Sequence, residues 1–105
     1  MTIEERRLAV HEKLCRVLNS NHVYFQPPPT VQMIYPAIVY RRESVDRLDA
    51  NDDVYIHRIQ YTVTVINNNP DKTYIQEMFD EFDYVDYDRH YTRDNLNHDV
   101  FTIYY

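Results

Sequence analysis

The sequence predicts one α+β domain, in which an antiparallel or mixed β-sheet of four to five strands carries two helices on one face. Three observations support this. The chain has 105 residues, a length that suits a single domain with one core. Two segments show apolar residues at helical spacing, and several others show the alternation of strands. No repeat or flexible linker divides the chain, so residues 1–105 are expected to fold together.

Residues 3–18 are expected to form the first helix. Thr2 is a candidate N-cap, and Glu5 three residues later completes a capping-box pattern. The apolar residues recur at helical spacing: Ile3, Val10, Leu14, Val17 and Leu18. Residues 19–21, Asn-Ser-Asn, should end the helix.

Two strands and a loop are expected next. Residues 23–26 read as a short strand that prolines 27–29 end, because proline cannot donate to a sheet ladder. Residues 33–41 are expected to form the second strand, with Pro36 indicating an edge position or a bulge. Residues 43–53 are polar and acidic, so a long hairpin loop is expected there.

The second half of the chain predicts a strand, a helix and two further strands. Apolar or aromatic residues alternate with polar ones in 54–66, at Tyr55, His57, Ile59, Tyr61, Val63 and Val65. After the break at 67–70, a helix at 71–82 should bury Ile75, Met78, Phe79 and Phe82. Segments 84–91 and 98–105 are expected to pair through a connection at 92–97, with Phe101, Ile103 and Tyr105 alternating.

The charge and cysteine content exclude several classes of protein. A net charge of -6 argues against a surface that neutralises nucleic-acid phosphates or anionic membranes. The single cysteine, Cys15, cannot form an intrachain disulfide, which fits folding in a cytoplasm. The first residues lack the apolar core of a signal peptide, and no stretch approaches the roughly 20 apolar residues that cross a bilayer. No membrane partner is expected.

The chain has 11 tyrosines and no glycine. Tyrosine is favoured in strands and at protein interfaces, because it joins a large apolar body to a polar tip. Without glycine the turns must rely on Asn, Asp and Pro. The composition also excludes every glycine-rich phosphate-binding loop.

Candidate chemical groups are few. His90, His98 and Asp99 could meet across a hairpin, although their spacing matches no metal-site signature. A dense acidic set could hold Ca²⁺ or Mg²⁺, or simply face solvent: Asp80, Glu81, Asp83, Asp86 and Asp88. Cys15, in mid-helix, is expected to be a small core residue rather than a nucleophile. The sequence therefore predicts no catalytic residue, no cofactor and no metal.

Four segments, in this order and spacing, resemble the small neck proteins of tailed bacteriophages, and in particular the tail completion or tail terminator group. They are VYFQPP at 23–28, MIYPAIVYRR at 33–42, YTVTVINNNPD at 61–71 and DRHYTRDNLNHDVFTIYY at 88–105. The resemblance covers most of the chain. It implies an α+β fold and a ring, usually a hexamer, that ends the tail tube and offers a docking face to the head.

The resemblance also implies partners and a location. The partners are other copies of the chain, the tail tube protein and a head-completion or connector protein. DNA passes through the lumen without specific binding, and the protein resides in the virion neck after assembly in the host cytoplasm. Three alternatives stay open: a head-side connector or stopper, a metal-dependent enzyme using His90, His98 and the Asp80–Asp88 carboxylates, and a soluble adaptor.

The expected protein interface lies in and beside the loop at 43–53. Its mixed charges suit a contact arm, since complementary charges fix register and speed docking. A mobile solvated loop is the alternative. The candidate interface residues are Arg41, Arg42, Glu43, Asp46, Arg47, Asp49, Asp52 and Asp53.

Overall fold

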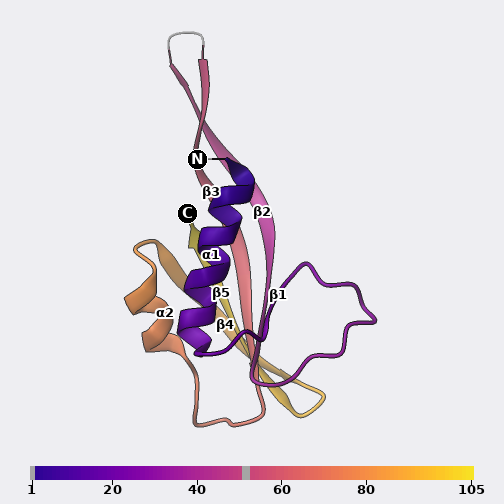
Figure 1. The fold of residues 1–105 in the computed structure, drawn as a ribbon. Helices are drawn as coiled ribbons and strands as arrows, with labels where there is room; N and C mark the ends of the chain where they lie inside the picture. Colours follow the sequence, from indigo (N-terminus) through magenta and orange to yellow (C-terminus); the bar gives the residue numbers. More distant parts are fainter. Residues whose placement is uncertain (1, 51–52) are drawn as a thin grey trace.

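The predicted α+β fold is confirmed. The computed structural model describes residues 2–50 and 53–105. Its elements follow in the order α1 (Ile3–Leu18), β1 (Val23–Phe25), β2 (Ala37–Ala50), β3 (Asp53–Asn67), α2 (Ile75–Glu81), β4 (Val85–Arg93) and β5 (Leu96–Tyr104). The strands form one mixed sheet in the order β1-β2-β3-β5-β4, and both helices pack on the same face of it (Figure 1).

The first helix begins and ends as the sequence predicts. The Thr2 hydroxyl accepts a hydrogen bond from the Glu5 backbone N–H at 3.1 Å, and the Glu5 carboxylate accepts one from the Thr2 backbone N–H at 3.4 Å. This reciprocal capping box satisfies N–H groups that the first turn leaves without partners. At the other end Asn19 takes a left-handed conformation with φ 54°, which stops the helix.

The core lies between α1, α2 and the middle strands. Ile59, Tyr61, Val63 and Val65 alternate along β3 and are buried, as the pattern predicts. They join β2, β5 and helix residues in one cluster, whose members also include Val10, Leu14, Ile38, Tyr40, Met78, Phe82, Phe101 and Ile103. The opposite face of the sheet, which we call the helix-free face, carries the alternate residues of these strands.

The turns rely on asparagine and aspartate, as a chain without glycine requires. Asp94 and Asn95 connect β4 to β5 with φ values of 53° and 63°. A two-residue hairpin turn of this kind needs positive φ at both positions, and Asp and Asn tolerate it best after glycine. The predicted connection at 92–97 is therefore confirmed and narrowed to two residues.

Several predicted boundaries are wrong for local reasons. Pro36 lies before β2 rather than inside it, because the strand starts at Ala37. The second helix starts at Ile75, not at residue 71, since residues 69–72 form turns in which Asn69 accepts bonds from the backbone of Asp71 and Lys72. Tyr74 then has φ 60°, a conformation that cannot belong to a right-handed helix.

Phe79 was predicted to be buried, and that prediction is wrong. Met78 is fully buried and Phe82 nearly so, whereas Phe79 stays 45% exposed. Ile75, Met78 and Phe82 are three and four residues apart and form the inward stripe. Phe79 lies at the edge of that stripe, and a helix of seven residues is too short to bury a wider face.

The predicted loop at 43–53 is also wrong, because residues 43–50 belong to β2 and pair with β3, which starts at Asp53. Residues 51–52 lie outside the described part of the chain. Backbone pairing extends to Leu48 opposite Tyr55 and to Ala50 opposite Asp53. Polar side chains are compatible with a strand when both faces meet solvent, so their presence does not exclude pairing. The hydrophobic alternation of a half-buried strand is lost there, which is why the segment resembled a loop.

The difference between Met78 and Phe79 gives a stability prediction. Met78→Ala should lower the free energy of unfolding by roughly 2–5 kcal/mol, because it removes a fully buried side chain from the core. Phe79→Ala should lower it by less than about 1 kcal/mol, since the ring is largely exposed. Urea denaturation of both variants measures this. A larger loss for Phe79→Ala than for Met78→Ala would contradict the observed orientation of α2.

Candidate functional site

The most prominent feature of the molecule is a two-stranded ribbon that projects from one end. We call residues 43–50 of β2 and 53–58 of β3 the arm. Figure 1 shows it extending past the N-terminal end of α1, clear of both helices. The arm makes the molecule long and narrow, with extents of 52 × 29 × 22 Å. The predicted interface segment is therefore an ordered projection and not an irregular loop.

Two β-bulges shape the arm. The pairing moves from Arg42–Tyr61 to Ser44–Gln60, which leaves Glu43 as an extra residue in β2. It then moves from Asp46–Arg58 to Arg47–Ile56, which leaves His57 as an extra residue in β3. Bulges bend a strand and increase its twist, and Figure 1 shows the two strands crossing in the arm.

The bulge at His57 changes which side chains face the helices. An extra residue reverses the alternation of a strand, so the predicted series does not continue from Ile59 back to His57 and Tyr55. Ile56 packs against the core instead, and Tyr55 is 54% exposed. Tyr55 lies directly opposite Leu48, which is 53% exposed. The arm thus carries an exposed apolar pair that was not predicted. Leu48, a large apolar residue between Asp46 and Asp49, was the feature of the sequence that could have indicated it.

The base of the arm is fixed by Arg6 of α1. Its guanidinium donates hydrogen bonds to the carbonyl oxygens of Ile56 at 2.9 Å, His57 at 3.1 Å and Tyr105 at 3.1 Å. Hydrogen bonds from a charged donor are stronger than neutral ones. Three segments far apart in the sequence are therefore tied together where the arm leaves the body.

The structure brings only some of the predicted interface residues together. Arg41 and Glu43 form an ion pair, and Glu43 also accepts from the Thr62 hydroxyl at 2.9 Å. The hydrogen bond from Arg41 is the main cause that lowers the pKa of Glu43. Arg42 pairs with Tyr61 and so belongs to the opposite, helix-covered face.

The remaining predicted interface residues lie further out. Asp46 lies opposite Arg58, and Arg47 lies opposite Ile56. Asp52, and the side chains of Asp49 and Asp53, are outside the part of the chain that the structure describes. The expectation of a contact surface on these three residues therefore stays a prediction.

A shallow groove of about 150 Å³ crosses the helix-free face of the sheet. Thr62 and Thr64 of β3 and Val100 of β5 contribute to it, and they present small side chains. Arg41 of β2 and Arg89 and Tyr91 of β4 are its larger members. The Arg89 guanidinium lies 5.6 Å from the centroid of the Tyr91 ring. We call these six residues the groove.

A second hollow of about 280 Å³ lies near the base of the arm, between α1, α2 and the ends of the strands. Lys13 and Glu81 form an ion pair beside it, and the Arg58 guanidinium lies 4.0 Å from the centroid of the Tyr84 ring. Lys13, Glu81 and Arg58 of this hollow thus already have partners within the chain. Nothing in its lining selects one class of ligand.

His90, His98 and Asp99, which were considered for a metal site, have other partners. His90 Nε2 lies 3.2 Å from Asn97 Oδ1, and His98 stacks on Tyr91 with ring centroids 4.6 Å apart. Asp99 is buried and accepts from the Tyr87 hydroxyl at 2.8 Å. Desolvation and then this hydrogen bond raise the pKa of Tyr87 to about 12.

Three residues of the acidic set make separate contacts. Glu81 binds Arg16 at 2.8 Å, Asp80 accepts from Gln76, and Asp88 accepts from the Thr102 hydroxyl. Within residues 2–50 and 53–105, no three His, Cys, Asp or Glu side chains come together in a way that could hold a metal ion.

A polar contact is buried beneath α1. His11 Nδ1 lies 2.7 Å from the Tyr40 hydroxyl, and Cys15 is partly buried nearby. Burial, assisted by the positive charge of Arg7, lowers the pKa of His11, although Glu12 opposes the shift. Burial also raises the pKa of the Cys15 thiol. A raised thiol pKa disfavours the nucleophilic thiolate and fits the expected role as a core residue.

Comparison of the chain with protein-family models, curated proteins and solved structures finds no match. Among the described helices, neither has the length and apolar content to cross a membrane.

The lowered pKa of His11 predicts how stability depends on pH. The unfolded chain takes up this proton near pH 6.5, whereas the folded protein takes it up only at lower pH. Stability should therefore fall as pH decreases from about 6.5 through the lowered pKa, because the unfolded state binds more protons there. His11→Asn keeps a hydrogen-bonding group near Tyr40 and should lose part of this fall. Urea denaturation at about pH 8 and about pH 5 measures it, with His90→Asn as the control. An equal pH dependence in the wild type and His11→Asn would contradict the prediction.

Proposed function

We propose that this chain is a structural subunit of a tailed-phage neck, which assembles into a homo-oligomeric ring, most simply a hexamer, that terminates the tail tube and joins it to the head. The observation that carries the proposal is the arm. An isolated two-stranded ribbon is marginally stable in water, and this one also exposes the Leu48–Tyr55 pair. An ordered projection of this kind is typical of a subunit that reaches a neighbour.

The resemblance to tail terminators supports the same role, because three of its four segments form the parts of the fold that position the arm. Residues 33–42 lead into β2, and residues 61–71 contain the inner half of β3. Residues 88–105 span most of β4 and β5, which complete the sheet beside it. The segments that resemble the family thus build one structural unit.

The charge is compatible with a ring around DNA. A net charge of -6 disfavours tight binding of phosphates, so an acidic lumen would let the genome pass without adhering. The partners in this role are the tail tube protein on one side and a head-completion or connector protein on the other. A head-side connector station in the same neck is the runner-up.

Electron microscopy tests the proposal directly. The purified chain, alone and mixed with tail tubes, should give rings of one subunit number that cap one end of each tube. Capping of the tube distinguishes a terminator from a head-side connector, which should bind portal-bearing heads instead. A protein that stays monomeric both in solution and in mature particles would overturn the proposal.

Shortening the arm gives a more local prediction. Replacing residues 48–55 with Asn-Gly keeps the Arg47–Ile56 pair and the carbonyls that Arg6 binds, and it removes Leu48 and Tyr55. The variant should unfold at nearly the wild-type urea concentration, since the two removed residues whose side chains the structure describes, Leu48 and Tyr55, are both exposed. It should nevertheless lower the yield of infectious particles by at least about tenfold, because the contact surface is gone.

Phe79→Ala is the matched control for this variant, because it also removes an exposed aromatic side chain but from a helix on the body. It should leave the particle yield unchanged. Normal yields with the shortened arm would remove the arm from the assembly mechanism.

A further inference from the structure

We infer that the arm of one copy docks in the groove on the helix-free face of a second copy. This inference rests on the proposed ring and names the surface that receives the arm. The two surfaces were defined above: the arm with its Leu48–Tyr55 pair, and the groove formed by Arg41, Thr62, Thr64, Arg89, Tyr91 and Val100.

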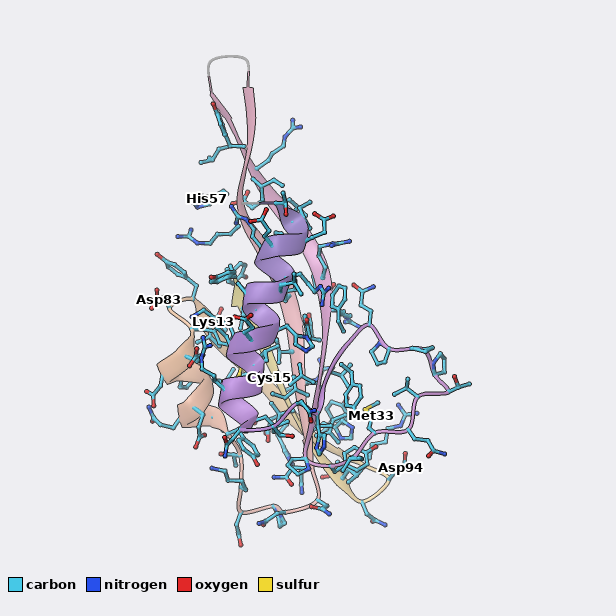
Figure 2. All side chains as sticks on the ribbon, viewed as in Figure 1. Lys13, Cys15, Met33, His57, Asp83 and Asp94 are labelled. Atoms are coloured by element: carbon cyan, nitrogen blue, oxygen red, sulfur yellow. The ribbon has the colours of Figure 1, made fainter. Side chains whose placement is uncertain are left out.

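The arm cannot reach the groove of its own chain. The strands β2 and β3 run continuously from the groove, at Arg41 and Thr62, to the arm, at Leu48 and Tyr55. Figure 2 shows the arm directed away from the body along the same line. Arg6 holds the base of the arm in this direction. An arm that docks in the groove must therefore come from another molecule.

The shapes of the two surfaces are compatible. The groove crosses the middle of the sheet, where threonines and Val100 leave a shallow surface between Arg41 on one side and Arg89 with Tyr91 on the other. The arm is a single ribbon without covering helices (Figure 1). Its half-exposed leucine and tyrosine can bury apolar surface there, and tyrosine is enriched at such interfaces.

The charges are complementary as well. The arm contains four carboxylates and two arginines, Arg47 and Arg58, so its formal charge is negative. The groove contains two arginines and no carboxylate, although Glu43 of the same copy already pairs with Arg41. Arg89, held against the Tyr91 ring, is thus the principal cation offered to an acidic arm. Complementary charges of this kind select the register and direction of docking.

The contact would be heterologous, because the arm and the groove are different surfaces of one chain. A heterologous contact repeats from copy to copy and generates a ring when the rotation closes. Each copy then donates one arm and receives one, and the exposed Leu48–Tyr55 pair and the helix-free face are covered together.

Photo-crosslinking in the full chain tests the inference. A benzophenone amino acid replaces Leu48, and equal amounts of nitrogen-15-labelled and unlabelled protein are mixed at the highest soluble concentration before illumination. Mass spectrometry should find mixed-label crosslinks from position 48 to residues 39–41, 62–64 or 89–91. Crosslinks to another surface of the second copy, crosslinks within one copy, or the absence of mixed-label crosslinks would each overturn the inference.

Arg89→Glu tests the charge contribution. It should reduce the mixed-label crosslinks by at least about tenfold, whereas Arg93→Glu, the same change further along β4 and outside the groove, should not. Equal effects of the two substitutions would contradict the role of Arg89. Unchanged circular dichroism and unfolding midpoints show that both variants fold.

Mixing two defective variants tests the direction of the contact. The shortened arm leaves the groove intact, and Arg89→Glu leaves the arm intact, so together they retain one productive contact. Their mixture should form two-subunit complexes and nothing larger in light scattering. Rings whose crosslinks lie elsewhere would overturn this inference and leave the neck function standing, whereas failure to cap tail tubes would overturn the tail-terminator role alone.

Discussion

Backbone pairing between β2 and β3 is the constraint on which the rest of the structure depends. The same ladder places Tyr40 and Val63 in the core and, further along, holds Leu48 opposite Tyr55 in solvent. Because the inner half is anchored by the burial of β3 under α1, the outer half is held in register without a core of its own. The arm is therefore an extension of the buried part of the sheet, and its direction is determined by the body.

The fold could be predicted wherever one face of an element is buried, because burial imposes a period on the sequence. The stripe from Val10 to Leu18 and the alternation from Ile59 to Val65 are examples. The capping box at Thr2 also located the start of α1. The errors lie where that period weakens. Residues 43–48 of the arm are exposed on both faces, and in α2 a seven-residue helix leaves the orientation of Phe79 undetermined by pattern alone. Tyr55 was assigned to the wrong face because the bulge at His57 is invisible in an alternating pattern.

The candidate site was predictable only in part. The charges around residues 43–53 marked the correct segment, but its polar composition predicted an irregular loop and gave no indication that Leu48 and Tyr55 form an exposed pair. The groove could not be predicted from the sequence, because it combines Arg41, Thr62 and Arg89 from three strands. Those strands become neighbours only through the order β2-β3-β5-β4, in which β5 lies between β3 and β4. Contacts of this kind depend on tertiary register, and no local spacing encodes them.

Arg6 shows how the body determines the geometry of the arm. Its terminal nitrogens bind three carbonyl oxygens, while its Nε is buried without a partner in the described structure. An unsatisfied buried donor costs roughly 1–3 kcal/mol, so the arrangement is tolerable only because the other bonds from this cation are strong. A shorter apolar residue would avoid that cost but could not join α1, the arm and the last strand. A ring that forms through a donated arm needs a constant angle between arm and body, since a small angular error repeated at each contact prevents closure. Arg6 lies at the base of the arm, where its hydrogen bonds can fix this angle.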